Sequence, residues 1–152
     1  MKIIILGAGQ VGGTLAEHLA NEQNDITVVD THAGKLRALQ DRLDIGTVTG
    51  GASHPNSLYK AVAEEADKLI AETNSDEINM MACQVAHTLF NTPKKISRVR
   101  SPNYLARQEQ LFNRDHIPVD VIIGPEQLVT ENIQRLITNP VSYTHLTLPT
   151  MQ

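Results

Sequence analysis

A glycine-rich stretch near the amino terminus carries the most specific chemical signal in the sequence. Residues 7–12 have the pattern G-x-G-x-x-G between a short apolar run and an amphipathic stretch, the context expected for a dinucleotide-binding turn. The first glycine permits the turn, the second lets the backbone approach a pyrophosphate, and the third lets a helix pack close to a strand. Free amides at the start of that helix favour bound negative charge. The alternative is a glycine-rich turn that binds nothing.

Asp30 ends the second apolar run, close to the spacing of about 20 residues from the glycines at which an acidic side chain meets a ribose. A carboxylate accepts hydrogen bonds from a 2′-hydroxyl and repels a 2′-phosphate, so the expected cofactor is NAD rather than NADP. Thr31 and His32 follow Asp30, and no arginine stands directly after it. The alternative is a solvated aspartate at the end of a strand.

Two further polar groups follow or end predicted strands, where ligands of parallel sheets bind. Thr73 and Asn74 begin a polar cluster in front of a helix, and Ser75 or Asn74 would cap that helix whether or not the cluster binds a ligand. Arg98 and Arg100 alternate on a predicted strand, so they are expected to share one face. A guanidinium there would suit a phosphate, and the alternative is a surface or interface pair.

The sequence shows no comparable pattern of catalytic or metal-binding residues. Cys83 and His87 have a helical spacing that zinc ligands use, but two ligands do not make a site, and a buried core cysteine is the simpler interpretation. The 6 histidines are scattered, without a nucleophile and an orienting partner beside them. We therefore expect no metal site, no catalytic residue and a protein that is not an enzyme.

Composition limits the remaining classes. The chain has 152 residues, enough for about one domain, with a net charge of −4 and only 3% aromatic residues. An aliphatic core is therefore expected, and nucleic acid is not an expected partner because it requires clustered Lys and Arg. The single cysteine fits a reducing compartment. No segment approaches the roughly 20 apolar residues that cross a bilayer, so we expect a soluble protein.

Short apolar runs alternate with longer amphipathic stretches, which predicts a Rossmann-like α/β fold: a doubly wound, parallel, six-stranded sheet with helices on both faces. The predicted strands are Lys2–Leu6, Asp25–Asp30, Ile45–Thr49, Lys68–Glu72, Lys95–Arg100 and Val119–Ile123. The predicted helices are Val11–Ala20, Gly34–Leu43, Asn56–Glu65, Asp76–Phe90, Tyr104–Phe112 and Pro125–Ile137. We expect one domain over residues 1–138. The pattern changes after Asn139-Pro140, so residues 139–152 are expected to be a tail, non-native or disordered, with a natural short strand as the alternative.

Several stretches together form a specific pattern along the chain. They are residues 1–12, Ile26–Thr31, Ser53–Pro55, Asp76–Met80, Ala82–Ala86, Leu89–Pro93, Arg98–Pro102 and Pro125–Val129. They resemble the first RCK N-terminal (KTN) domain of the regulatory subunits of bacterial Trk potassium uptake systems. The similarity covers about residues 1–140. Members of that family are longer, with an RCK C-terminal domain and a second copy of the pair.

The resemblance implies a nucleotide-binding regulatory subunit that binds NAD(H), and also ATP or ADP. Such a protein is cytoplasmic and peripheral on the inner face of the cell membrane, where it gates a potassium-translocating membrane subunit. The cofactor-binding residues implied by the motif and the resemblance are Gly7, Ala8, Gly9, Gln10, Val11 and Gly12 for the phosphates, Asp30 for the ribose, and Thr73, Asn74 and Arg98 for the rest of the pocket.

The resemblance also implies a homo-oligomer, a dimer of the domain with a higher assembly in the full-length protein. In the family, the helix expected at Pro125–Ile137 crosses to a partner subunit, and here it carries a broad apolar stripe. The stripe consists of Leu128, Val129, Ile133, Leu136 and Ile137. The alternative is that this is simply the last helix of a monomeric fold.

Two departures from the family pattern bear on the site. Gly50-Gly51-Ala52 replaces a stretch that more often has an acidic or histidine residue after glycine, and Glu72 places a charge where the family often has a small or apolar residue. Two other functions stay open at this point. One is the N-terminal cofactor domain of an NAD-dependent dehydrogenase, whose chemistry would come from a substrate domain. The other is a nucleotide-stabilised dimerisation domain without regulatory output.

Overall fold

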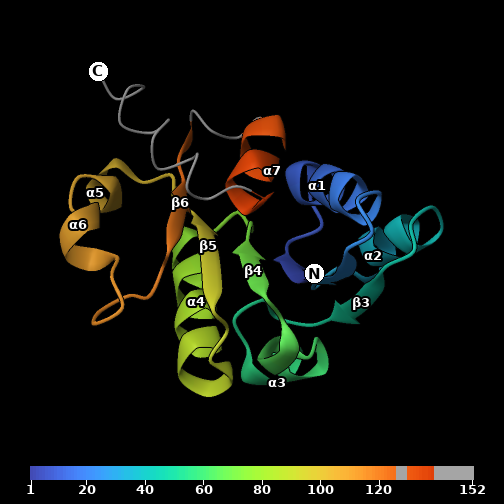
Figure 1. Cartoon of the computed structure of the whole chain (residues 1–152), viewed down its shortest axis with the longest axis horizontal. Coiled ribbons are helices and arrows are strands. Elements are labelled where there is room, and N and C mark those ends of the chain that lie inside the picture. Colours follow the sequence, from blue (N-terminus) through green and yellow to red (C-terminus); the bar gives the residue numbers. More distant parts are fainter. Residues whose placement is uncertain (126–129, 139–152) are drawn as a thin grey trace.

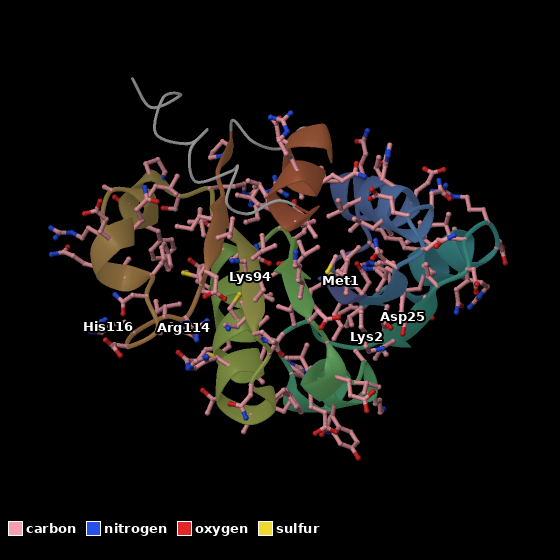
Figure 2. All side chains as sticks on the ribbon, viewed as in Figure 1. Met1, Lys2, Asp25, Lys94, Arg114 and His116 are labelled. Carbon is pink, nitrogen blue, oxygen red and sulfur yellow. The ribbon has the colours of Figure 1, made fainter. Side chains whose placement is uncertain are left out.

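A computed structural model of the chain describes residues 1–125 and 130–138, and it contains a single parallel sheet with strand order β3-β2-β1-β4-β5-β6. The strands are β1 (Lys2–Leu6), β2 (Asp25–Asp30), β3 (Gly46–Thr49), β4 (Lys68–Ala71), β5 (Lys94–Arg98) and β6 (Val121–Ile123). The predicted doubly wound, six-stranded α/β fold is therefore confirmed. At the amino ends of β1 and β2, Lys2 and Asp25 form an ion pair with an Nζ–Oδ2 distance of 3.4 Å (Figure 2).

Helices cover both faces of this sheet, as the sequence predicts. The described helices are α1 (Gln10–Ala20), α2 (Ala33–Gln40), α3 (Pro55–Lys60), the short 3-10 helix η1 (Ala63–Glu65), α4 (Asp76–Phe90), α5 (Pro102–Leu105), α6 (Gln108–Leu111) and α7 (Thr130–Thr138). Figure 1 shows α1, α2 and α7 on one side of the sheet and α3 and α4 on the other. None of the helices within residues 1–125 and 130–138 has the length and apolar character of a membrane span.

The aliphatic core lies in two layers because successive strand residues point to opposite faces of the sheet. On β1, Ile3 and Ile5 pack under α1, whereas Ile4 and Leu6 pack over α3 and α4. Both pairs are fully buried, so β1 is apolar from Ile3 to Leu6, as expected of a central strand in a parallel sheet. Cys83 of α4 is also fully buried in the second layer, which confirms the expectation of a core cysteine.

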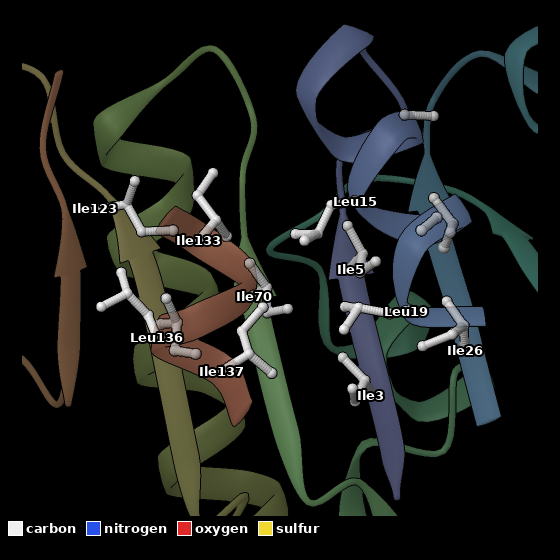
Figure 3. Close-up of a cluster of buried hydrophobic side chains, with 14 of the residues drawn as sticks. Ile3, Ile5, Leu15, Leu19, Ile26, Ile70, Ile123, Ile133, Leu136 and Ile137 are labelled. Atoms are coloured by element: carbon white, nitrogen blue, oxygen red, sulfur yellow. The ribbon is translucent and has the colours of Figure 1, made fainter. Parts of the chain in front are cut away.

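Helix α7 packs against the sheet of its own chain, and the expectation that the helix at Pro125–Ile137 crosses to a partner subunit stays a prediction. Figure 3 shows Ile133, Leu136 and Ile137 beside Ile70 of β4 and Ile123 of β6, and all of them belong to the first core layer. Leu128, Val129 and the predicted tail at 139–152 lie outside the described residues.

Several predicted boundaries are corrected by local backbone geometry. The single helix expected at Asn56–Glu65 is divided into α3 and η1 because Val62 adopts a left-handed conformation, with φ of 61°. The helix predicted at Tyr104–Phe112 begins earlier, because α5 starts at Pro102. It is also divided, because Arg107 is not helical and separates α5 from α6. The helix predicted at Gly34–Leu43 begins at Ala33 and ends at Gln40. Each change moves a helix end or divides a helix without altering the strand order.

Candidate functional site

A pocket of about 550 Å³ opens at the carboxyl ends of the central strands, where the chain order reverses between β1 and β4. Ligands of doubly wound sheets bind at this switch point, and the volume lies within the usual range for small-molecule sites. The pocket is lined by the predicted site residues Gly7, Gly9, Gln10, Val11, Gly12, Asp30, Thr73, Asn74 and Arg98. Ala8 does not line it and is largely buried.

The glycines of the turn are required by close approach and by backbone conformation. Gly7 has φ of +112°, and a Cβ there would lie 2.6 Å from the carbonyl oxygen of Glu72. A Cβ on Gly12 would lie 2.1 Å from the carbonyl oxygen of Gly7, so only glycine lets α1 start this close to β1. A Cβ on Gly9 would meet nothing within 4 Å. The backbone at Gly9 therefore faces open space at the start of α1, and no side chain caps the helix there.

Asp30 is held as an anion by the backbone. Its Oδ2 accepts a hydrogen bond of 2.8 Å from the Ala8 N–H, and its Oδ1 accepts one of 2.7 Å from the His32 N–H. Burial raises the pKa of the Asp30 carboxyl, but these hydrogen bonds outweigh burial and leave the pKa below its ordinary value. Within the described part of the chain, its ion-pair partner is the exposed ring of His32 at 3.3 Å, so no lysine or arginine occupies the carboxylate.

A network centred on Asn79 fixes the loop between β4 and α4. The Asn79 Oδ1 accepts hydrogen bonds from the Thr73 N–H at 2.9 Å and the Thr73 hydroxyl at 2.6 Å. Its Nδ2 donates to the carbonyl oxygens of Thr73 and Arg98 at 3.2 and 3.0 Å. Ser75 caps α4 by accepting from the Ile78 N–H at 3.2 Å, which confirms one of the expected caps. The ends of β4 and β5 are thereby held in a fixed relation.

Glu72 and Arg98 form a buried ion pair in the same pocket. The distance between Glu72 Oε1 and Arg98 Nη1 is 3.1 Å, and the Glu72 side chain is only 1% exposed. Within residues 1–125 and 130–138, Glu72 Oε2 and Arg98 Nε have no hydrogen-bond partner. Burial raises the pKa of the Glu72 carboxyl to about 7, although the positive charges of Arg98 and Arg100 act in the opposite direction. Glu72 comes directly after β4 rather than within it, which corrects the predicted strand end.

Arg100 does not share a strand face with Arg98, which is a second correction. β5 ends at Arg98, and the chain then turns so that the Arg100 N–H donates to both carboxylate oxygens of Asp76 at 3.0 Å. The exposed Arg100 side chain donates to the carbonyl oxygen of Asn74 and does not line the pocket. Asp76 accepts a further N–H from Ser101 at 2.8 Å, and these bonds explain why the strand stops early.

Two neighbouring segments line the pocket but were not among the predicted site residues, although Gly50-Gly51-Ala52 was named above as bearing on the site. The segment after β3 lines it with Gly50, Gly51, Ala52, Ser53 and His54, and the segment after β2 adds Thr31, His32 and Lys35. The segment after β3 could have been identified from the sequence, because β3 was predicted and the carboxyl ends of parallel strands meet at one edge of the sheet. Lys35 had no such signal. It stands on α2, and its charge lowers the pKa of Asp30.

Fold and site together define a Rossmann-type domain with a glycine turn and an acidic residue at the carboxyl ends of its central strands. The chain belongs to the TrkA-N domain family, whose model matches residues 3–125. It is 65% identical over 140 residues to the Trk system potassium uptake protein TrkA of Halomonas elongata. That alignment covers 92% of this chain but 30% of the relative, so the chain spans less than a third of that protein's length.

Solved structures show the same fold. The TrkA-N domain of the inner membrane protein ybaL from Escherichia coli has a TM-score of 0.71 at 18% identity, covering 92% of this chain and 96% of that one. The GsuK channel bound to NAD has a TM-score of 0.66 at 20% identity, covering 80% of this chain and 21% of the channel chain. At such identities the likeness concerns the fold alone.

Proposed function

We propose that this chain is a nucleotide-binding regulatory domain of a potassium uptake system, and that its ligand is NAD(H), with ATP and ADP as competing ligands. The observation that carries the proposal is the open pocket at the glycine turn, with the carboxylate of Asp30 at its edge and no lysine or arginine among the described residues ion-paired with it. The similarity to a Trk system protein and to a channel solved with NAD supports the same conclusion.

The residues of the pocket fit a dinucleotide. The exposed backbone at Gly9 and the uncapped start of α1 would hold the diphosphate, because the first amides of a helix have no partner within it. Asp30 retains lone pairs beyond its two backbone hydrogen bonds, so it would accept the hydroxyls of a ribose. The N–H of Ala8 is already bonded to Asp30, and Ala8 would therefore position that carboxylate rather than contact a phosphate.

Thr73, Asn74 and Arg98 would line the remainder of the site. Hydrogen bonds from Asn79 fix Thr73 and the backbone of Arg98, so this side of the pocket is preorganised before a ligand binds. The Arg98 side chain is 14% exposed and belongs to the pocket wall, which gives it access to an anionic ligand. The bound nucleotide would act as a signal, and the described pocket residues would bind and orient it without changing it.

A ligand alters gating only through its different affinity for two conformations of the assembly. The membrane partner would be the potassium-translocating subunit, with the protein peripheral on the cytoplasmic face and assembled as a homo-oligomer. Testing the gating step requires the full-length gene product together with its membrane subunit, in a potassium flux assay with and without nucleotide.

Binding can be tested on this chain directly. Isothermal titration with NADH, NAD⁺, ATP and ADP should give saturable binding, and a ligand at about 100 times its dissociation constant should stabilise the fold by about 2.7 kcal/mol. Absence of binding by all four nucleotides would refute the proposal. Oxidation of added alcohols or hydroxy acids in the presence of NAD⁺ would instead favour a dehydrogenase.

Asp30→Asn should weaken NADH binding by about tenfold or more, because an amide cannot accept hydrogen bonds through both of its terminal atoms. Asp25→Asn is a matched control on the same strand, since Asp25 lies exposed at the opposite end of β2 and outside the pocket. Equal effects of the two substitutions would show that the carboxylate of Asp30 does not contact the ligand.

A further inference from the structure

Glu72 is a buried acid inside a pocket whose proposed ligands are all anions. Its side chain is almost fully covered, yet one carboxylate oxygen has no partner among residues 1–125 and 130–138. Neither the glycine turn nor the ribose-binding acid needs a second carboxylate at this position. The feature therefore calls for a functional explanation in this particular chain.

The partner of Glu72 is a cation well suited to a phosphate. Arg98 uses Nη1 for Glu72, while its Nε is buried without a partner in the described structure. A guanidinium that binds a phosphate bidentately uses two parallel N–H groups, and the contact with Glu72 engages one of the available donors. Because Asn79 fixes the Arg98 backbone, a change of partner would have to occur by movement of the side chain alone.

The charges of the pocket wall are balanced by this pair. The lysine and arginine side chains that line the pocket are Lys35 and Arg98, and the acidic ones are Asp30 and Glu72. Without Glu72, the wall would carry an excess of one positive charge. A ligand with more phosphates gains more from that excess, because the Coulomb energy increases in proportion to the ligand's charge.

We propose that Glu72 is a specificity-determining residue that holds Arg98 away from phosphates and thereby favours NAD(H) over ATP in this pocket. The inference rests on the proposed nucleotide-binding function and deepens it. ATP carries more negative charge than ADP, and ADP carries more than NADH. The cost of keeping Glu72 ionised beside the ligand is therefore largest for ATP and smallest for NADH. Glu72 acts through Arg98, and it is therefore a positioning residue.

The experiment compares affinities for NADH, ADP and ATP by isothermal titration of the unchanged chain and of Glu72→Gln. Burial raises the pKa of the Glu72 carboxyl to about 7, so titrations at about pH 8 keep this carboxyl largely ionised in the unchanged chain, and Glu72→Gln then removes its negative charge. At the effective dielectric of a protein surface we expect Glu72→Gln to tighten ATP binding by about tenfold, ADP binding by less, and NADH binding by about threefold, because NADH carries about half the negative charge of ATP. Glu72→Val, which removes both the charge and the carboxyl group, should shift the ratio in the same direction.

Two controls separate this effect from a general change in the fold. Glu64→Gln removes the same charge from an exposed position of η1 outside the pocket, and it should leave the ratio of ATP to NADH affinities unchanged. Glu72→Gln combined with Arg98→Met should lose most of the gain in ATP affinity, because the freed guanidinium is then absent. Circular dichroism checks that each variant is folded before it is titrated.

The possible results separate a failure of the role of Glu72 from a failure of the proposed nucleotide-binding function. An increase in the ATP-to-NADH ratio that depends on Arg98 supports the role of Glu72. Equal changes for both ligands, or no change, would overturn that role while leaving nucleotide binding intact. If the unchanged chain binds no adenine nucleotide, the proposed function and the role of Glu72 fail together.

Discussion

Neutralising Glu72 should stabilise the folded chain, and the gain should depend on pH in a defined way. Burial raises the pKa of this carboxyl from 4.5 to about 7, so the folded state binds its proton more tightly than the unfolded state does. The stability of the native protein therefore falls as the pH increases through this interval. Below pH 4.5 the group is protonated in both states and the penalty is absent.

The size of the penalty follows from the shift. Each pKa unit corresponds to about 1.4 kcal/mol, so ionising Glu72 in the folded protein costs about 3 kcal/mol once the pH exceeds about 7. Glu72→Gln has nearly the same shape but cannot ionise, and it should unfold at a higher urea concentration than the unchanged chain at about pH 8. The difference in free energy of unfolding should decrease steadily towards pH 4.5.

Urea unfolding followed by circular dichroism measures this difference at several pH values. The other titratable groups are the same in both proteins, so their contributions cancel in the comparison. Glu64→Gln serves as the control, because an exposed substitution should change stability by less than about 0.5 kcal/mol at every pH. A difference between Glu72→Gln and the unchanged chain that stays constant over the whole interval would refute the reasoning, because it would show that burial does not perturb this carboxyl.

Three further substitutions test the framework around the site. Gly12→Ala would place a Cβ 2.1 Å from the carbonyl oxygen of Gly7, so it should cost about 2–4 kcal/mol in urea unfolding and abolish nucleotide binding in titrations. Lys95→Ala leaves Asp120 without the buried ammonium that lies 3.2 Å away, and calorimetry should show a loss of about 3–5 kcal/mol, larger than that of Lys95→Met. Asp76→Ala removes the acceptor for two backbone N–H groups after β5, and it should destabilise the chain by about 1–3 kcal/mol in urea unfolding.

The bounds of β1, β2 and α4 were predictable because clear sequence signals mark both of their ends. β1 and β2 have the predicted bounds Lys2–Leu6 and Asp25–Asp30, since their apolar runs end abruptly at a glycine turn and at a charged residue. α4 also has its predicted bounds, Asp76–Phe90, because acidic residues and a serine cap mark its start. These signals are local and strong, and the surrounding structure reinforces them.

The outer half was less predictable because its boundaries depend on contacts made at a distance. β5 stops at Arg98 because Asp76, which stands on another element, takes the N–H of Arg100. The left-handed conformation of Val62, which divides the predicted helix at Asn56–Glu65, has no signal in the residue type, since β-branched residues rarely adopt it. The apolar stripe of α7 does not state which surface it covers, and in this structure Ile133, Leu136 and Ile137 cover the sheet of their own chain.

The two carboxylates of the pocket show what strand order adds to a motif. Asp30 ends β2 and Glu72 directly follows β4, the two strands on either side of β1. Both acids line one pocket, so residue type and placement at the sheet edge do not distinguish them. Their pKa values nevertheless move in opposite directions, because backbone N–H groups stabilise the anion of Asp30 whereas burial opposes the anion of Glu72. A preformed anion is suited to accept hydroxyls at constant charge. The anion of Glu72 is opposed by burial and is stabilised by Arg98. A ligand that takes Arg98 away from Glu72 removes this stabilisation, and its binding is weakened by the same free energy. The same sheet edge thus supplies a fixed acceptor on one side of the glycine turn and a variable counter-charge on the other, and the variable side is where this chain would tune its choice of nucleotide.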